Sequence, residues 1–290
     1  MKKKILILGS EGQVGDHLVN FFNNKKNYEI IRFDIVMSDS YDLRKYNNQD
    51  LETKIKKSDF IFFLAFDVGG SRYLKKNQKT YDFLMNNLLI MTNVFSMIKK
   101  YDKKFIFTST QMSNMNFSTY GLLKKIGEEV TKSLNGIYIK LWNIYGIEKN
   151  FRKSLSHDVI TDFILMGLKD KKISMITNGN ESREFLNAED CSAGLFLIMS
   201  KFNFFLKQKT ELHLSTGKKT KVIEIAKIVK KVLSRRNIII KIKPSPKKDD
   251  VQNNAKNKAN KFLHKYYKPK VNLEQGIEKI INYYLRKKYN

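Results

Sequence analysis

Three glycines near the N-terminus constrain the fold of this chain more than any other feature. Gly9, Gly12 and Gly15 follow an apolar run at residues 4–8, which has the pattern of a buried strand, and precede a helical pattern at 16–24. Glycines at this spacing allow a tight turn and a close approach of the backbone to a pyrophosphate, and the following helix N-terminus supplies free N–H groups. The sequence therefore predicts a dinucleotide-binding turn, with a plain glycine turn as the alternative.

The rest of the sequence continues this alternation of strand-like and helical patterns. Strands are expected at residues 4–8, 29–36, 59–66, 104–108 and 136–142, and helices at 16–24, 80–100 and 118–134. Helical patterns follow at 158–168, 191–204, 221–233 and 273–285, with a β-rich run at 237–242. This order predicts an α/β fold, a Rossmann-type doubly wound parallel sheet with a smaller C-terminal α/β domain. We expect a cofactor domain over residues 1–150 and a substrate domain over 151–290, with a soft boundary and some segments returning to the first domain.

Composition excludes several classes of protein. The chain has 290 residues, of which 42% are hydrophobic and one is cysteine, so a disordered tail, a disulfide framework and a Cys-based zinc site are excluded. The four histidines show no metal-ligand spacing, so we expect no metal. No apolar run approaches the roughly 18 residues of a membrane span, and no signal peptide is recognisable. We therefore expect a cytoplasmic location and no membrane partner.

The chain is strongly basic, with 55 Lys and Arg against 28 Asp and Glu and a net charge of +27. Such a charge can attract nucleic acid, anionic membranes or anionic substrates. The lysines are spread along the whole chain, and Asn, Ile and Phe are also abundant, which is the pattern of a genome rich in A and T. We favour compositional drift over a selected basic surface, and we expect no specific nucleic-acid partner. A positive field around an anionic substrate fits both interpretations.

Asp34 ends the second expected strand, about 20 residues after the glycines. A carboxylate at this position accepts hydrogen bonds from both ribose hydroxyls of adenosine and repels a 2′-phosphate. The sequence therefore favours NAD over NADP as the cofactor. The alternative is a solvent-exposed loop aspartate.

A second motif places Tyr120 and Lys124 one helical turn apart, so that both side chains lie on one face. An ammonium near a phenol favours the phenolate, and we expect it to lower the pKa of Tyr120 towards neutrality. Such a tyrosine can take a proton from a sugar hydroxyl while a hydride leaves the same carbon. Thr110, at the end of the preceding strand, offers a hydroxyl to the reacting oxygen.

Together these motifs resemble the extended short-chain dehydrogenase/reductases, of the NAD-dependent nucleotide-sugar epimerase/dehydratase family. The resemblance covers nearly the whole chain. It implies that cofactor binding involves Gly9, Gly12, Gln13, Val14, Gly15, Asp34, Asp42, Leu43, Leu64, Ala65, Phe66, Asn87, Tyr120 and Lys124. It also implies a catalytic trio of Thr110, Tyr120 and Lys124, and substrate binding by Gly69, Gly70, Gln111, Asn143 and Arg183, where Asn143 and Arg183 would hold the diphosphate.

The chain departs from this family in one segment. Only nine residues separate Thr110 from Tyr120, where the family usually has about two dozen, and the missing piece normally forms a loop beside the sugar. Where 4,6-dehydratases carry Asp-Glu after the threonine, this chain has Gln111-Met112, so dehydration is not expected.

The resemblance implies NAD-dependent oxidation at C4 of a nucleotide-activated sugar by a 4-epimerase or a C4 dehydrogenase. The segment 65–70 with Asn86-Asn87 is most similar to members that act on GDP-linked hexoses, and a hexose or heptose for a surface (capsule) polysaccharide is the expected substrate class. A 4-keto-sugar reductase and a non-catalytic NAD-binding sensor are the alternatives. We also expect a homodimer, paired through an apolar stripe of the Tyr120 helix at Leu123, Ile126, Gly127 and Val130; burial of that stripe against the chain's own sheet is the alternative.

Overall fold

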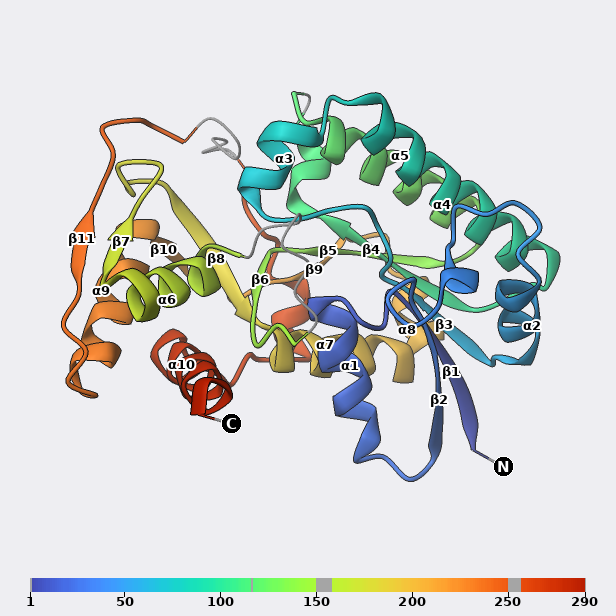
Figure 1. Cartoon of the computed structure of the whole chain (residues 1–290). Helices are drawn as coiled ribbons and strands as arrows, with labels where there is room; N and C mark the ends of the chain where they lie inside the picture. Colours follow the sequence, from blue (N-terminus) through green and yellow to red (C-terminus); the bar gives the residue numbers. More distant parts are fainter. Residues whose placement is uncertain (1, 116, 150–157, 250–256, 290) are drawn as a thin grey trace.

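A parallel sheet with the strand order β2-β1-β3-β4-β5-β9 dominates the computed structural model, which describes residues 2–115, 117–149, 158–249 and 257–289 (Figure 1). Its strands are β1 (Lys3–Leu8), β2 (Tyr28–Phe33), β3 (Phe60–Phe63), β4 (Phe105–Thr110), β5 (Ile137–Leu141) and β9 (Leu212–Leu214). Each neighbouring pair runs parallel. The predicted α/β fold with a Rossmann-type parallel sheet is confirmed.

Helices cover both faces of this sheet. One face carries α1 (Gln13–Asn23), α7 (Ala188–Ser200) and α8 (Phe202–Leu206), and the other carries α2 (Gln49–Lys57), α4 (Tyr81–Lys100) and α5 (Thr119–Ser133). Strand β1 shows why both faces are covered: Leu6 and Leu8 enter one apolar cluster, whereas Ile5 and Ile7 enter the other. Because successive side chains of a strand point to opposite faces, an uninterrupted apolar run requires a helix layer on each side.

The second part of the molecule has its own, smaller core. Its strands are β6 (Asn143–Tyr145), β7 (Lys172–Ser174), β8 (Ser182–Asn187), β10 (Lys219–Lys221) and β11 (Lys241–Lys243), in the sheets β10-β8-β6 and β11-β7. Its helices are α6 (Val159–Asp170), α9 (Val222–Ser234) and α10 (Leu273–Tyr289). A third apolar cluster, which includes Ile164, Val229 and Ile280, joins these elements.

The chain crosses between the two parts more than once. After β8 in the smaller part, α7, α8 and β9 return to the large sheet, where α7 packs beside α1. The chain then passes back to the smaller part for β10 and α9. Part of the range 151–290 thus completes the core of the first part, as the soft boundary allowed. The division into two domains at residue 150 stays a prediction.

Several short elements were not expected from the sequence. These are α2, α3 (Ser71–Asn77) and the three-residue strands of the smaller part. The helix expected at 191–204 is divided near Lys201, and the β-rich run at 237–242 contributes only to β11. Three residues are too few to show a periodicity, so such strands form where a neighbouring strand offers hydrogen bonds.

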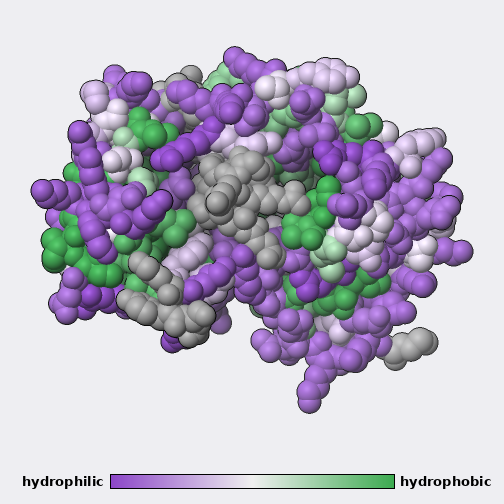
Figure 2. All heavy atoms as spheres, in the orientation of Figure 1, coloured by the Kyte–Doolittle hydropathy of each residue, from purple (hydrophilic) through white to green (hydrophobic). Residues whose placement is uncertain are grey.

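Hydrophilic side chains cover most of the face seen in Figure 2. Within the described ranges, no helix is long and apolar enough to cross a membrane. Those ranges also contain no group of three or more His, Cys, Asp and Glu side chains suited to a metal ion. Cys191, the one cysteine of the chain, is fully buried, which fits a structural role.

Candidate active site

The glycine turn joins β1 to α1 and is too crowded for larger residues. Gly9 has a φ of 86°, and a Cβ there would lie 2.7 Å from the backbone nitrogen of Ala65. A Cβ on Gly15 would lie 2.0 Å from the carbonyl oxygen of Gly9. Gly12 is the exception, because its nearest neighbour would be 3.5 Å away, so its side is open. The turn therefore presents bare backbone at the N-terminus of α1, the arrangement that a pyrophosphate needs.

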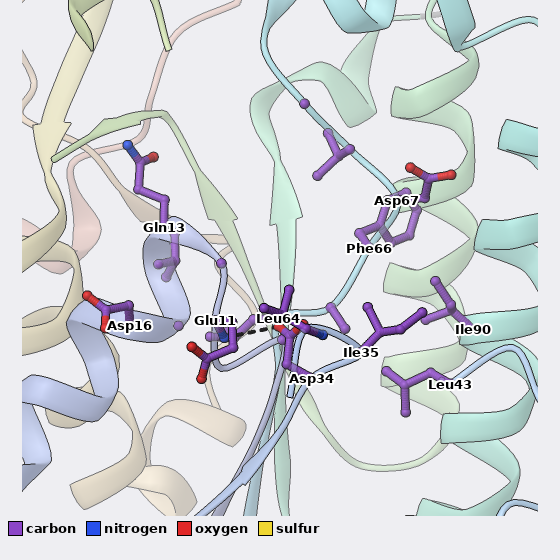
Figure 3. A pocket seen from close by; sticks show the side chains of 18 of the residues that line it. Glu11, Gln13, Asp16, Asp34, Ile35, Leu43, Leu64, Phe66, Asp67 and Ile90 are labelled. Atoms are coloured by element: carbon purple, nitrogen blue, oxygen red, sulfur yellow. Dashed lines mark hydrogen bonds between the residues drawn. The ribbon is translucent and has the colours of Figure 1, made fainter. Parts of the chain in front are cut away.

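A cavity of about 520 Å³ lies beside this turn (Figure 3). The residues expected at the cofactor that line it are Gly9, Gly12, Gln13, Val14, Gly15, Asp34, Asp42, Leu43, Leu64, Ala65 and Phe66. Gly69 and Gly70, expected at the substrate, line it as well. Its volume is in the range of cofactor sites, and the open turn at Gly12 faces the same space. The residues present therefore fit a dinucleotide.

Asp34 lies where β2 ends and holds the glycine turn. Its carboxylate accepts hydrogen bonds from the backbone N–H of Glu11 and of Val36, both at 3.0 Å. Figure 3 shows Asp34 beside Glu11 in the centre of the pocket. A carboxylate anchored in this way is pre-oriented, so it could accept ribose hydroxyls without losing side-chain freedom.

Asp42 is paired with Arg44, which the sequence reading did not single out. The guanidinium donates to both carboxylate oxygens of Asp42, at 2.9 and 2.8 Å. These hydrogen bonds lower the pKa of Asp42 below its ordinary value. Arg44 also donates to the side chain of Asn86 at 3.2 Å, so the Asp42 end of the cavity is linked to α4.

Asn87 does not line the cavity and is fully buried. Its side chain accepts from the N–H of Asp67 at 2.7 Å and donates to the carbonyl of Asp67 at 3.0 Å. Asn87 thus fixes the backbone of the segment that follows β3. This arrangement favours a supporting role over direct contact with the cofactor, although the sequence placed Asn87 among the cofactor ligands.

Thr110 and Tyr120 meet at the C-terminal end of β4. Thr110 donates to Oε1 of Gln111 at 3.1 Å and accepts from the N–H of Met112 at 3.3 Å, and its hydroxyl is close enough to Tyr120 to lower the pKa of the phenol. Gly121 explains how the short connection between them closes, because a Cβ there would lie 2.1 Å from the carbonyl oxygen of Met112. The turn η2 (Gln111–Asn114) therefore packs directly on the first turn of α5.

Lys124 is held by a strand carbonyl and by two aromatic rings. Its Nζ donates to the carbonyl of Thr108 at 2.7 Å, and the residue is only 3% exposed. The ammonium also lies 3.9 Å from the ring centroid of Phe66 and 4.7 Å from that of Phe107. Burial lowers the pKa of Lys124 to about 7, with the nearby Glu128 acting in the opposite direction.

The expected lowering of the Tyr120 pKa is wrong for this structure. Burial raises the pKa of Tyr120 to about 12, and the hydrogen bond with Thr110 offsets only part of that effect. The physical reason is that Lys124 donates to Thr108 while the phenol lies in an apolar environment, which penalises the phenolate. Tyr120 is therefore a neutral phenol in the free protein.

Two of the residues expected to bind substrate, Asn143 and Arg183, lie on the smaller part of the molecule. Asn143, on β6, donates to the backbone carbonyl of Glu184 at 3.2 Å. Arg183, on β8, donates through Nη2 to Asp249 at 2.8 Å. Among the residues described, none accepts a hydrogen bond from the buried Nε of Arg183. The backbone of Gln111 accepts from Asn257 at 2.6 Å, which ties the Thr110 turn to this side.

A carboxylate cluster that sequence reasoning missed lies between the glycine turn and α6. The side-chain amide of Gln13 donates to Glu148 at 3.1 Å and to Asp158 at 3.0 Å. Asp158 also caps α6 by accepting from the N–H groups of Ile160 and Thr161. Burial, followed by the charge of Glu148, raises the pKa of Asp158 to about 7. An aspartate before a helical pattern signals an N-cap, but nothing in the sequence signals its contact with Gln13.

A buried polar network under the Thr110 turn was also missed. Lys140, on β5, donates to Asn114 at 2.8 Å and to Glu211 at 2.7 Å, and its Nζ lies 3.8 Å from Glu128. Glu128 in turn accepts from Ser109 at 2.5 Å. These contacts join α5, β5 and β9 to the strand end that carries Thr110.

The fold and this site define a class of protein. A doubly wound parallel sheet, an open glycine turn, an aspartate after the second strand and a Thr, Tyr and Lys trio at the end of β4 are the features of an extended short-chain dehydrogenase/reductase. The chain belongs to the NAD dependent epimerase/dehydratase family, whose model matches residues 5–210. The expected family is confirmed, and with it NAD as the cofactor.

Relatives and solved structures that share this fold differ in their reactions. GDP-L-colitose synthase of Yersinia pseudotuberculosis is 24% identical over 99% of each chain. A GDP-6-OMe-4-keto-L-xylo-heptose reductase from C. jejuni superposes with a TM-score of 0.80 at 19% identity, over 99% of this chain and 98% of that one. UDP-glucose 4-epimerase of Thermotoga maritima gives 0.77 at 20% identity, over 99% and 100%. The chain is similar to all three, so the family fixes nucleotide-sugar chemistry more firmly than one reaction.

Proposed function

We propose that this protein transfers a hydride between NAD and C4 of a nucleotide-activated sugar, as a 4-epimerase or a C4 dehydrogenase. The observation that carries the proposal is the proximity of Thr110 and Tyr120 at the end of β4, next to a cavity suited to a dinucleotide. NAD supplies the hydride acceptor when it is bound. The residues of the chain bind the sugar, orient it and move the proton.

Tyr120 is the proton carrier in this proposal. Its phenol can gain and lose a proton and lies next to the hydroxyl of Thr110. The two hydroxyl groups together can hydrogen-bond the oxygen at C4. Because the phenol is neutral in the free protein, oxidation requires its pKa to fall before it can accept a proton. A positive charge close to the phenolate would lower that pKa, and Lys124 in its protonated form, one turn further along α5, is the proposed source of that charge.

Arg183 supports an anionic substrate. Its guanidinium is mostly buried, with its side chain 11% exposed, and Asp249 occupies only its Nη2 within the described structure. A buried guanidinium with an N–H left over suits the oxygens of a diphosphate. Asn143, on the neighbouring strand of the same sheet, is the second proposed contact. A GDP-linked hexose or heptose for a surface polysaccharide remains the proposed substrate class, and we place the enzyme in the cytoplasm as a homodimer.

A 4-keto-sugar reductase is the second candidate, and a specific observation favours it. Burial raises the pKa of Tyr120 to about 12, so its hydroxyl keeps its proton in the free protein. A phenol held protonated in this way is ready to give a proton to the oxygen at C4, which is the step that reduction needs. A non-catalytic sensor is less well supported, because both Tyr120 and Lys124 are retained.

The experiment is to incubate the purified protein with a panel of UDP-, GDP- and dTDP-sugars, with NAD and separately with NADH on the 4-keto forms. Nicotinamide absorbance and product mass are read together. A 4-epimer without net absorbance change supports the epimerase, accumulation of NADH supports the dehydrogenase, and consumption of NADH supports the reductase. If the protein binds NAD but transforms no nucleotide sugar, the sensor interpretation takes first place.

A further inference from the structure

Phe66 lies at the point where the cofactor cavity meets the proposed catalytic residues. Its ring centroid is 3.9 Å from Nζ of Lys124 and 5.7 Å from the ring of Tyr120, which it meets edge-on at 70°. Phe66 is the third residue after the end of β3 (Phe60–Phe63). The end of the central sheet therefore sets its position.

The ring of Phe66 forms part of the cavity wall on the side of the catalytic residues. Phe66 is among the residues that line it, whereas Thr110, Tyr120 and Lys124 are not among the described residues of its wall. Figure 3 shows Phe66 beside Asp67 at one side of the pocket, with Gln13 and Asp16 on the opposite side. A dinucleotide that occupies the cavity and reaches Tyr120 must therefore pass the position of the Phe66 ring.

The ammonium of Lys124 is enclosed on several sides. Phe66 covers one side, the ring of Phe107 lies 4.7 Å from Nζ on another, and the carbonyl of Thr108 accepts its hydrogen bond. An aromatic face attracts a cation, and the attraction is stronger where water is excluded. The Phe66 ring is therefore held in its observed position by a cation–π contact with Lys124.

The backbone beneath the ring is held in place, so the side chain is the part that can move. Asn87 clamps both backbone groups of Asp67, and the carboxylate of Asp67 accepts from Tyr73 at 2.6 Å and from Asn86 at 2.8 Å. Phe66 itself is only partly buried and borders the cavity. A rotation about its side-chain bonds would open the cavity towards Lys124 without displacing the strand.

We propose that Phe66 is the gating residue of the cofactor site: in the free protein its ring covers Lys124 and closes the nicotinamide end of the channel, and it turns aside when the nicotinamide riboside enters. Lys124 then exchanges the aromatic face for hydroxyl groups of the ribose. This inference rests on the proposed function: the hydride leaves C4 beside Tyr120, so the nicotinamide would lie at the end of the cavity next to Tyr120 and Lys124. Displacing the Phe66 ring then costs binding free energy only for ligands that carry a nicotinamide riboside.

The test compares two ligands that share the adenosine and the diphosphate. ADP fills the part of the cavity near the glycine turn, whereas NAD extends past Phe66. In Phe66→Ala the gate is absent, so the Kd for NAD should fall about 2- to 30-fold, the range that the loss of one cation–π contact corresponds to. The Kd for ADP should stay within about twofold. Both are measured by calorimetry on the full chain.

Two further variants separate gating from a change in folding. Ile35→Ala alters a cavity residue away from Phe66, so it should change the NAD and ADP affinities by the same factor. Phe66→Leu keeps an apolar side chain but removes the aromatic face, so it should also tighten NAD binding, to a smaller extent than alanine. Stopped-flow binding of NADH should show a slow, concentration-independent opening phase in the parent that is lost in Phe66→Ala.

The outcomes are distinguishable. Weaker NAD binding by Phe66→Ala and Phe66→Leu, with ADP unchanged, would show that the ring supports the nicotinamide, and the gate would be overturned. Unchanged affinity for NAD in both variants would overturn it as well. If the parent protein binds ADP but not NAD, and the variants do not restore NAD binding, the proposed function fails independently of the gate.

Discussion

Lys140 and Glu211 form an ion pair at 2.7 Å, and the side chain of Lys140 is fully buried. The same ammonium donates to Asn114, the last residue of the turn that begins next to Thr110. Hydrogen bonds from His213 and then from Lys140 hold the pKa of Glu211 well below its ordinary value. The catalytic turn is therefore supported from below by a charge network that spans β5, β9 and α5.

Lys140→Met should destabilise the fold, because Glu211 loses its partner at 2.7 Å and the fully buried Glu128 loses a second positive charge at 3.8 Å. Breaking a buried ion pair by removing one partner typically costs about 3–5 kcal/mol, and Lys125, which stays 3.1 Å from Glu128, should keep the loss near the lower end of that range. The urea midpoint measured by circular dichroism would show this loss. Lys132→Met, which removes a half-exposed lysine paired with Glu129, is the matched control and should cost less than about 1 kcal/mol. Equal midpoints for the two variants would contradict the role given to Lys140.

Asp34→Ala should weaken NAD binding and relax the discrimination against NADP. The substitution removes the ribose acceptor, the charge that repels a 2′-phosphate and the anchor of the Glu11 N–H. Hydrogen bonds to a charged group contribute about 1.5–3 kcal/mol, so NAD affinity should fall about 10- to 100-fold. Calorimetric titration with both cofactors measures it, with the exposed Asp39→Ala as control. Unchanged affinities for NAD and NADP would show that Asp34 does not contact the ribose.

Asp158 should make the protein less stable as the pH rises from about 4 to about 7. Its pKa is raised to about 7 by burial, whereas in the unfolded chain it is near 3.9. In this window the folded state holds a proton that the unfolded state has lost, so the free energy of unfolding decreases with pH. Asp158→Asn keeps the N-cap of α6 and should remove about 3 kcal/mol of this loss of stability across the window. Denaturant titrations at several pH values measure the slope, and an equally steep slope in the variant would refute this assignment.

Only part of the stripe expected at the dimer contact is exposed. Leu123 and Gly127 pack inwards, where a Cβ on Gly127 would lie 2.5 Å from the ring of Phe107. The exposed apolar side chains of α5 are Leu122, at 59% exposure, and Ile126, at 43%, and only Ile126 belongs to the expected stripe. The neighbouring helix α4 adds Leu88 and Leu89.

Sedimentation at micromolar concentration should therefore give a mass near two chains, and Ile126→Glu should reduce it to one. The control is Ile239→Glu, which changes an exposed isoleucine outside α4 and α5 and should leave the mass unchanged. A parent mass near one chain would rule the homodimer out.

The sequence predicted the main strands well because their burial is continuous. The side chains of residues 5–8 alternate between the two cores, and Lys4 is the only polar residue in the run at 4–8. This pattern indicates a buried strand. Strand β9 was not predicted, since its three residues pair with β5 only after more than 70 intervening residues bring them together. The pairing depends on the chain returning from the smaller part, which local patterns do not encode.

The candidate site was predicted in its motifs but not in its electrostatics. The positions of Tyr120 and Lys124 on one helix face follow from their spacing, but the direction of their pKa shifts depends on what surrounds them. Phe66 and the carbonyl of Thr108 enclose the lysine, and neither contact follows from a spacing in the sequence. The partner of Arg183, Asp249, lies 66 residues away and was likewise beyond prediction.

The most direct test of the central claim is the rate of hydride transfer by Tyr120→Phe on whichever nucleotide sugar the parent transforms. The variant removes only the phenolic hydroxyl, so the fold and NAD binding should survive, while the proton at C4 loses its positioned partner. The rate should fall about 10²–10⁴-fold, and Tyr46→Phe, at a residue 83% exposed, should keep the parent rate. If Tyr120→Phe transforms the sugar as fast as the parent, the active site has been assigned to the wrong residues.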